Sequence, residues 1–333
     1  AHLHTAGVPV DWEPAFTGSH ARRIDLPTYA FKRERFWVAR GPRSGRSAAF
    51  DHPLLSGEVP LPDSGGGVLT GVLTLADQPW LADHSVSGEV IFPGTGFVEL
   101  ALQAGLRFGC DAVEELTLEG PLVLPERGPV EIQVSVAGLD DEAHRSVSIH
   151  ARREDGDWFR HATGSLGVAL DMPSLPEAWP PADARRVETD EVYDVLEGRG
   201  YTYGPVFRGL RGAWRRGDEV FVEVEVPEDA RGDASRCAVH PALLDAALHG
   251  VGLGGLIADD GRAYLPFSWT DVAVHGVGAS SLRAVLSPVG QDAVSLLVGD
   301  DSGAPVLSVG SLALRPVTTE QLHDTRGNTI NSL

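Results

Sequence analysis

The feature of this sequence that most constrains its fold is an internal repeat, in which short matching segments recur at one spacing. Glu99 begins the run Glu-Leu-Ala-Leu-Gln, and Asp245 begins the similar run Asp-Ala-Ala-Leu-His, at an offset of 146 residues (245 − 99). Gly164 and Gly310 each begin Gly-Ser-Leu at the same offset. Matches in the same order at one offset indicate a duplicated unit. Chance similarity is the alternative, because each match is short.

Each copy of the repeat combines one apolar, helix-like segment with stretches of alternating apolar and polar residues. The helix-like segments are 93–106 and 241–253, each with Pro near its start and Gly near its end. Alternating stretches typical of half-buried strands follow, such as VEIQVSVAG from Val130 and PVLSVGSLALRPV from Pro305. One helix wrapped by an antiparallel sheet is an α+β arrangement, so the sequence predicts two such units.

Charge and proline content mark the boundaries of the two units. Residues 1–50 hold eight basic and four acidic groups in a chain whose net charge is −20, and they lack periodicity. A proline-rich stretch that begins at Met172 is typical of a connector. The predicted organisation is a linker at 1–50, a first unit at 51–171, a connector at 172–187, a second unit at 188–317 and a polar tail at 318–333.

Composition excludes several classes of protein. Apolar residues make up 42% of the chain, enough for a core, and no apolar run approaches the ~18 residues that a membrane span needs. The net charge of −20 argues against nucleic acid and anionic membranes as partners. Two cysteines, Cys110 and Cys237, cannot form a disulfide framework or a four-cysteine zinc site. From this composition we expect a cytoplasmic protein. The only methionine is Met172, so we also expect the chain to be a piece of a longer polypeptide.

Two positions hold residues suited to proton transfer. His84 precedes an apolar stretch and the glycine-rich start of the first helix-like segment, although a satisfied loop or core histidine is the alternative. Asp245 lies within the otherwise apolar PALLDAALHGVGL, and a buried carboxylate is costly unless it is paired or protonated. His249, four residues later, can reach Asp245 on the same helix face. A helix acid turned toward solvent is the alternative for Asp245.

A third segment, GYTYGPVF at 200–207, predicts a tight turn that presents aromatic side chains, with a turn over the core as the alternative. A metal site on His240, Asp245 and His249 is a weaker hypothesis, because no compact set of further ligands accompanies them. The glycine-rich segments lack the spacing of phosphate or dinucleotide loops, and no G-x-S-x-G elbow is present.

Four motifs in this chain together resemble those of dehydratase domains from modular type I polyketide synthases. In chain order they are HSVSGEVIFP from His84, GYTYGPVF from Gly200, DAALH from Asp245 and LPFSW from Leu265. They match the family patterns HxxxGxxxxP, GYxYGPxF, Dxxx(Q/H) and LPFxW. Residues 1–40 also resemble the end of an acyltransferase domain and the linker that follows it. The chain is similar to a dehydratase excised from an actinomycete synthase.

The resemblance implies a double hotdog fold, in which each of two fused units wraps a curled antiparallel sheet around one helix. It implies loss of water from a β-hydroxyacyl thioester on an acyl carrier protein, giving the α,β-unsaturated thioester. His84 would remove the α-proton. Asp245, which apolar surroundings keep protonated, would protonate the leaving hydroxyl. The family uses no metal and no organic cofactor beyond the carrier's phosphopantetheine.

The resemblance also implies supporting roles and partners. Backbone amides near Gly94 would stabilise the thioester oxygen, and His249 with Tyr201 or Tyr203 would orient Asp245. The expected partners are an acyl carrier protein and other domains of the same synthase. Basic residues near the mouth of the site are candidates for carrier docking, with solvated surface charges as the alternative: Arg315, Arg211, Arg215 and Arg216.

A homodimer is also expected, with contacts near 51–53 and the adjoining sheet edge. Two other functions stay open: a hotdog thioesterase, which would activate water, and a non-catalytic scaffold related to dehydratases. Isomerisation of a double bond is compatible with the same two residues. A non-catalytic version usually lacks one member of the His/Asp pair, and both His84 and Asp245 are present.

Overall fold

The structure is a computed structural model that describes residues 51–317 except 155, 170–173, 257–260 and 291, together with six separate positions before residue 19. The chain divides into two compact units, 1–46 and 47–333, and the elements below belong to the second. The linker expected at 1–50 lies outside the described residues apart from those six positions, as does the whole tail expected at 318–333.

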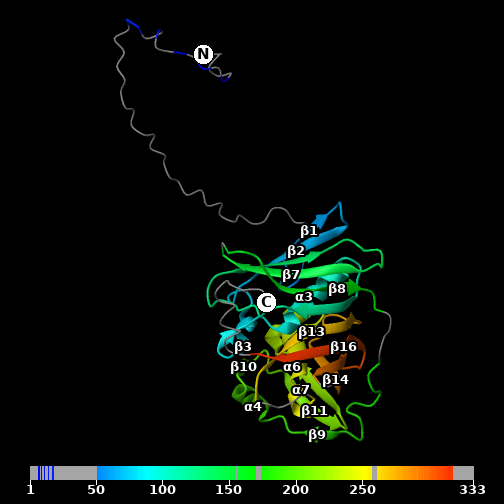
Figure 1. The fold of residues 1–333 in the computed structure, drawn as a ribbon. Helices are drawn as coiled ribbons and strands as arrows, with labels where there is room; N and C mark the ends of the chain where they lie inside the picture. The colour runs from blue at the N-terminus through cyan, green and yellow to red at the C-terminus, as the bar shows by residue number, and fades with distance from the viewer. Residues whose placement is uncertain are drawn as a thin grey trace. The chain divides into compact units, whose positions relative to one another are not determined.

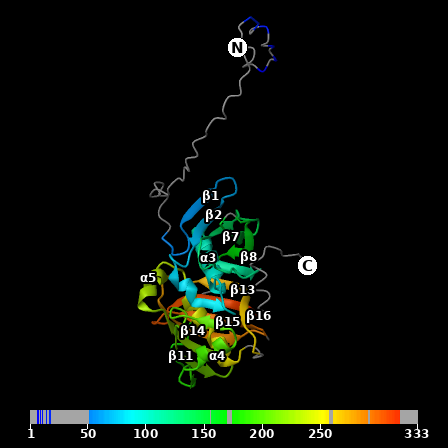
Figure 2. The same ribbon diagram turned by 90° about the vertical axis from the view of Figure 1, so that its left-hand side faces the viewer.

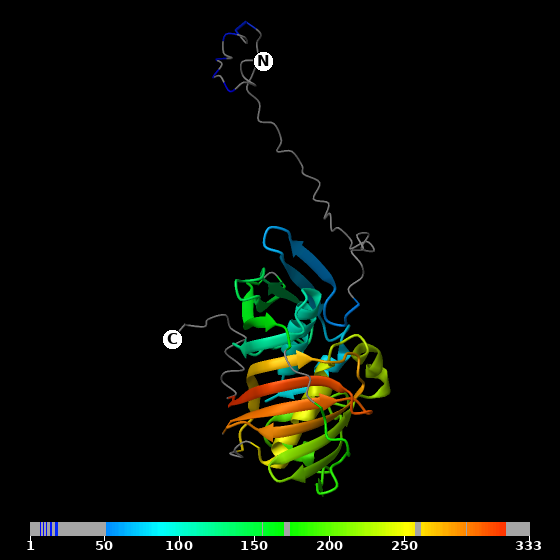
Figure 3. The ribbon, with the colours of Figure 1, turned by 90° about the vertical axis from the view of Figure 1, so that its right-hand side faces the viewer.

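An antiparallel sheet of thirteen strands forms the frame, and its two sides come from the two halves of the sequence. The first side runs, in spatial order, through β1 (Gly57–Leu61), β2 (Gly66–Leu73), β6 (Val130–Val136), β7 (Arg145–Arg153), β8 (Phe159–Gly167) and β5 (Ala112–Leu118). The second continues with β13 (Tyr264–Val274), β16 (Pro305–Pro316), β15 (Ala293–Gly299), β14 (Ser281–Pro288), β12 (Glu219–Glu225), β11 (Leu210–Arg216) and β9 (Arg185–Val187). Figures 1 and 3 show the two sides meeting at β5 and β13.

The order of the strands confirms the duplication. Outward from the seam, where Leu116 pairs with Trp269, β5-β8-β7-β6 on one side matches β13-β16-β15-β14 on the other. The inward faces of the strands alternate as predicted; β6, for example, buries every second residue. The fold is the double hotdog, an α+β architecture.

One helix occupies each half of the sheet. Helix α3 (Gly94–Arg107) packs against β5, β6 and β8, and α6 (Pro241–Leu248) packs against β12 and β14. Figure 2 shows α3 next to β8. Both helices are apolar on nearly all sides, which is typical of helices enclosed in a core. Leu100 of α3 is fully buried, so truncating it to Ala would cost about 2–5 kcal/mol of stability. The helices meet where Thr95 Oγ1 donates a 2.9 Å hydrogen bond to Pro241 O, between positions 146 residues apart.

The second helix is shorter than the sequence predicts. It was expected to run through 241–253, but α6 ends at Leu248 and a separate α7 (Gly250–Gly254) follows. Three of the five residues of α7 are glycines, which lose the most conformational freedom in a helix. Gly255 then ends α7 in the left-handed conformation, with φ 60°.

Several short elements complete the fold. They are the 3₁₀ turns η1 (Pro79–Asp83) and η2 (Glu228–Ala230), helices α4 (Val192–Gly198) and α5 (Arg231–Ala234), and a small sheet of β10 (Tyr201–Tyr203), β3 (His84–Val86) and β4 (Glu89–Val90). The small sheet joins two motifs that lie more than a hundred residues apart, because Tyr203 pairs with His84 across β10 and β3.

The described part of the expected connector 172–187 is irregular up to its last three residues, which form β9 and pair with β11. The second half of the sheet therefore begins before residue 188. Cys110 and Cys237 are both buried, free thiols. Within the described residues, no helix has the length and apolar character needed to cross a bilayer.

Candidate active site

His84 is the first residue of β3, and its imidazole is buried. The turn at Ser87-Gly88, where Gly88 has φ 83°, reverses the chain and brings Ile91 back beside His84. His84 Nδ1 donates a 2.9 Å hydrogen bond to Ile91 O, an arrangement that leaves Nε2 as the basic nitrogen. Burial lowers the pKa of His84, and the charge of Asp245 opposes that shift. The ring is therefore neutral near pH 7 and able to accept a proton.

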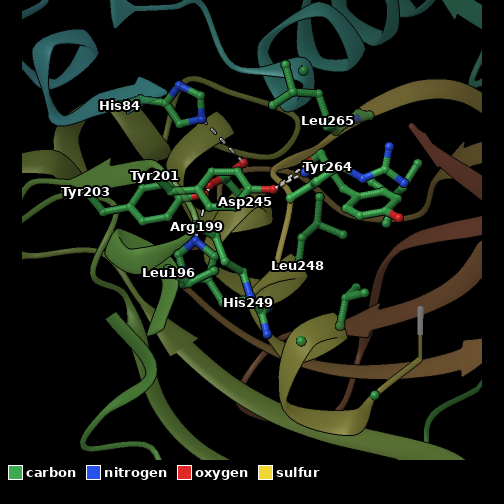
Figure 4. A pocket seen from close by; sticks show the side chains of 17 residues that line it. His84, Leu196, Arg199, Tyr201, Tyr203, Asp245, Leu248, His249, Tyr264 and Leu265 are labelled. Carbon is green, nitrogen blue, oxygen red and sulfur yellow. Dashed lines mark hydrogen bonds and ion pairs between the residues drawn. The ribbon is translucent and has the colours of Figure 1, made fainter. Parts of the chain in front are cut away.

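Asp245 lies on the second turn of α6. The sequence starts this helix with Pro241 at the first position and His240 as cap, whose Nδ1 accepts from Ala242 N at 3.3 Å. Asp245 Oδ1 lies 4.0 Å from His84 Nε2, so the two halves of the fold bring the predicted pair face to face (Figure 4). Both side chains are less than a tenth exposed.

His249 and the aromatic residues of β10 close the other side of Asp245. His249 Nε2 lies 3.3 Å from Asp245 Oδ2, although this contact lacks the alignment of a hydrogen bond. The Tyr203 ring packs 4.5 Å from His249 and 5.7 Å from His84, centroid to centroid. Tyr201 is directed elsewhere: its hydroxyl donates to Tyr264 O at 2.6 Å.

Both tyrosines stay protonated at physiological pH. Burial raises the pKa of Tyr203 well above its usual range, and Asp245 adds to the effect. Burial likewise raises the pKa of Tyr201 to about 12. Each phenol can therefore donate a hydrogen bond but carries no charge next to Asp245.

The turn after β10 is fastened to the residue before His84. Asp83 Oδ2 accepts from Val206 N at 2.9 Å, and Asp83 O accepts from Gly204 N at 2.8 Å. A Cβ on Gly204 would stand 2.1 Å from Asp83 Oδ1, so only glycine permits this approach. The segment expected to be a tight aromatic turn is thus a strand plus a turn, and Asp83 is its anchor. Asp83 was not among the predicted site residues, although it adjoins the motif histidine His84.

A cavity of about 970 Å³, including its open mouth, joins these residues. Gly94 lines it at the start of α3, where no side chain caps the helix and the Gly96 amide donates to Pro93 O at 2.9 Å. A Cβ on Gly94 would stand 2.8 Å from Pro266 Cβ, within the LPFSW motif. The cavity therefore combines an imidazole, a carboxyl group and the first residue of a helix, a set that suits removal of a proton next to a carbonyl group.

Family models and solved structures match this chain. One model, described as polyketide synthase dehydratase domain, matches residues 52–152, and another, described as polyketide synthase dehydratase N-terminal domain, matches 172–324. A dehydratase structure from work on substrate selection in the borrelidin and fluvirucin synthases is 47% identical, with TM-score 0.78 over 81% of this chain and 97% of that one. The chain is a dehydratase domain of a polyketide synthase. It therefore belongs to a hydro-lyase family that dehydrates β-hydroxyacyl intermediates.

Other relatives place this dehydratase within much longer proteins. Polyketide synthase GfsA of Streptomyces halstedii is 50% identical over 96% of this chain, which spans 4% of that synthase. Mycoketide-CoA synthase of Mycobacterium tuberculosis is 50% identical over 95% of this chain, or 8% of its own length. A more distant structure, the dehydratase of the CurK module of the curacin synthase, is 24% identical with TM-score 0.73 over 81% of this chain and 99% of that one. Variants of that domain with one histidine changed to phenylalanine, or one aspartate to asparagine, are inactive.

The cavity of the dehydratase gathers all six residues predicted to serve catalysis and its support, but not the arginines predicted to dock a carrier. Those six are His84, Gly94, Tyr201, Tyr203, Asp245 and His249. Arg315 lies over the Phe267 ring, 3.2 Å from its centroid, Arg211 Nε lies 3.8 Å from Glu225 Oε2, and Arg215 donates to Gly217 O. Arg216 Nη2 lies 2.8 Å from Glu219 Oε2, and none of these four arginines lines the cavity among the described residues.

Two other arginines, Arg199 and Arg262, do line the cavity, and the sequence analysis missed both. Each lies within three residues of a motif, Arg199 before Gly200 and Arg262 before Leu265. That proximity was the available signal, because motif segments form the walls of the site.

The metal hypothesis is not supported by the geometry of the second helix. His240 caps α6 and packs 4.8 Å from the Trp80 ring, and it does not line the cavity. Burial lowers the pKa of His240 to about 4. Among the described residues, the cluster with metal-ligand spacing is instead His52, Glu99 and Cys237, outside the cavity.

Proposed function

We propose that His84 is the base and Asp245 the acid for the loss of water from a β-hydroxyacyl thioester carried on an acyl carrier protein. The observation that carries this proposal is the 4.0 Å approach of His84 Nε2 to Asp245 Oδ1 at one cavity. The inactive histidine and aspartate variants of the CurK dehydratase support it.

In the proposed reaction, His84 Nε2 takes the α-proton, and the electrons of the broken C–H bond form the Cα=Cβ double bond. The Cβ–O bond breaks with its electron pair on oxygen, and Asp245 supplies the proton that makes the leaving group water. The products are an enoyl thioester, water, a protonated His84 and an ionised Asp245. Return of the proton between these adjacent groups restores the starting state.

The charge that develops on the thioester oxygen is stabilised at the start of α3. Gly94, the first residue of α3, lines the cavity, and the helix dipole favours negative charge at this end of the helix. Tyr203 and His249 hold Asp245 in place by packing around it. These steps use side chains, backbone amides and the phosphopantetheine arm of the substrate.

The proposed partners are the acyl carrier protein, other domains of a cytoplasmic synthase and a second copy of this chain. Arg315 is the leading candidate for carrier docking, with Arg211 and Arg215 as alternatives. For the homodimer, β1 is an edge strand whose Val59 is 55% exposed, so it is open to pairing with another copy. Light scattering at micromolar concentration tests this, and a monomeric mass would exclude the dimer.

The test of the reaction uses both epimers of a 3-hydroxyacyl thioester, on a carrier protein and on a simple soluble thiol. Mass spectrometry follows loss of water and release of the free acid in the same sample. We expect the enoyl thioester from one epimer. Hydrolysis without dehydration would identify a thioesterase, and no turnover of either epimer would leave only a binding role.

A further inference from the structure

A second buried carboxylate lies at the repeat position that corresponds to Asp245. Glu99 of α3 precedes Asp245 of α6 by the repeat offset of 146 residues, and its side chain is fully buried. It does not line the cavity that contains Asp245. The mechanism above does not use it, yet burial of an unpaired carboxylate would be costly.

The acceptor sites of Glu99 are filled by hydrogen bonds. Its Oε1 and Oε2 accept from the backbone amides of Ala238 and Val239, each at 2.9 Å. Two side chains add bonds at 3.0 Å, from His52 Nε2 and from Gln103 Nε2.

The imidazole that bonds Glu99 is itself fixed in one tautomer. His52 Nδ1 accepts from the amides of Leu54 and Leu55, each at 3.1 Å, so Nε2 carries the hydrogen that Glu99 accepts. The arrangement differs from the active pair, in which His84 donates from Nδ1 and keeps Nε2 basic.

A metal site does not explain this cluster, although His52, Glu99 and Cys237 have ligand atoms within 4.8 Å of one another. The imidazole and both carboxylate oxygens already hold partners, and a metal would have to displace two backbone amides. Burial also raises the pKa of the Cys237 thiol, which disfavours the thiolate that binds metals.

The two amides belong to the segment that leads directly into the catalytic helix. Val239 is followed by His240, the cap of α6, and by Pro241, its first residue. Thr95 Oγ1, one turn before Glu99 on α3, donates to Pro241 O at 2.9 Å. Helix α3 therefore fixes the start of α6 by three hydrogen bonds from two side chains.

We propose that Glu99 is a positioning residue for the dehydration, because it fixes the start of α6 and thereby the location of Asp245 opposite His84. His84 and α3 belong to the first half of the fold, whereas Asp245 belongs to the second. A rigid connection between α3 and the start of α6 keeps the distance between acid and base constant. Asp245 lies about 6 Å along the axis from Pro241, the first residue of α6, so movement there is transmitted to the carboxyl group.

The main test variant is Glu99→Gln, which has the same shape. The Gln side chain has an NH₂ group in place of one carboxylate oxygen. This donor would face either a backbone N–H or the N–H of His52, and two donors repel each other. We expect kcat on a soluble 3-hydroxyacyl thioester to fall about 10- to 100-fold, the effect of small misplacements, with KM changed less than twofold. Faster hydrogen exchange at the amides of Ala238 and Val239 would show the released segment without reference to activity.

The second variant and the control are chosen on the same helix. Thr95→Val removes the bond to Pro241 with little change of volume, and we expect kcat to fall several-fold. Gln103→Leu removes a bond to the same Glu99 oxygen but leaves the amides of the segment in place, so its kcat should stay near that of the wild type. All rates are taken per folded enzyme, well below each melting temperature.

The inference rests on the proposed function, and the outcomes separate the two. A wild-type enzyme that dehydrates, with Glu99→Gln and Thr95→Val variants as active as Gln103→Leu, would overturn the positioning role alone. If Glu99→Gln does not fold, unchanged kcat and amide exchange in Thr95→Val would overturn it. A wild-type protein that dehydrates neither epimer would overturn the proposed function, whatever the variants do.

Discussion

The two helices of this dehydratase occupy equivalent places in the duplicated fold and have opposite arrangements of polar groups. Helix α6 has its start capped by His240 and turns the Asp245 carboxyl toward the cavity. Helix α3 leaves its start uncapped at Gly94, the repeat equivalent of His240, and surrounds its own carboxylate, Glu99, with hydrogen-bond donors. The duplication thus supplied two helix starts and two carboxyl groups. Of these, the cavity is lined by the helix start of the first half, at Gly94, and by the carboxyl group of the second half, Asp245.

In the proposed reaction, the Asp245 carboxyl group, next to His249, supplies a proton to the leaving hydroxyl. The Glu99 side chain instead accepts from two backbone amides and, as proposed, positions α6. The chemical difference between the halves therefore comes from the partners of two equivalent residues.

The largest expected effect comes from removing the active pair. His84→Ala and Asp245→Ala should each lower kcat by about 10³-fold or more, because proton transfer contributes 10²–10⁴-fold per group. The double variant should be little slower than either single one, since both groups serve one step. Circular dichroism and single-turnover assays check fold and rate, and a fully active His84→Ala variant would refute the assignment of the base.

The Asp245→Asn variant tests whether Asp245, unlike Glu99, donates a proton in the reaction. Asn has nearly the same shape and can form hydrogen bonds, but it cannot deliver a proton to a leaving hydroxyl. We expect a loss of about 10²-fold or more in kcat, with KM nearly unchanged. If most of the activity survived, Asp245 would be a binding group, and His84 would have to act as both base and acid.

Low pH should weaken the cap that His240 provides at the start of α6. Helix α3 has no side-chain cap. The pKa of His240 is about 4 in the fold and 6.5 when unfolded, so the unfolded chain takes up the proton first as pH falls. Stability is then lost between pH 6.5 and about 4, by about 3 kcal/mol in total. Denaturant titrations at pH 7 and pH 4.5 should show a smaller loss in His240→Asn, which caps without titrating. Equal losses in both proteins would remove His240 as the cause.

The uncapped start of α3 is tested by Gly94→Ala. The added Cβ would stand 2.8 Å from Pro266, so the helix start or the LPFSW strand must shift. We expect kcat to fall about tenfold through misplacement of the amides. Gly120→Ala is the matched control, because nothing lies within 4 Å of a Cβ there. Similar activity in both variants would argue against a role for the α3 amides.

The smallest expected effect concerns the surface. Arg315 belongs to the second half, and its repeat equivalent in the first half is Ala169. Arg315→Glu should slow the reaction of carrier-bound substrate several-fold and reduce its salt dependence, while a soluble thioester reacts at the normal rate. Equal losses on both substrates would indicate structural damage, and no loss on either would leave Arg315 as a solvated charge.

The sequence alone determined the duplicated α+β fold and six of the residues in the cavity. Period-2 and helical patterns survive in the core because buried faces tolerate few polar residues. His84, Asp245 and the two tyrosines could be predicted because each belongs to a short motif of neighbouring residues. The helix boundary at Leu248 was predicted less well, since the glycines that follow fit either a helix or a turn.

Only the tertiary structure decided which groups are partners. The pairing of β10 with β3, the anchoring of Gly204 by Asp83 and the positions of Arg199 and Arg262 at the cavity depend on contacts between distant segments. The same holds for Glu99, which in sequence is simply the counterpart of Asp245. A carboxyl group becomes an acid or a fixed acceptor according to the donors around it, and chain folding alone brings those donors near.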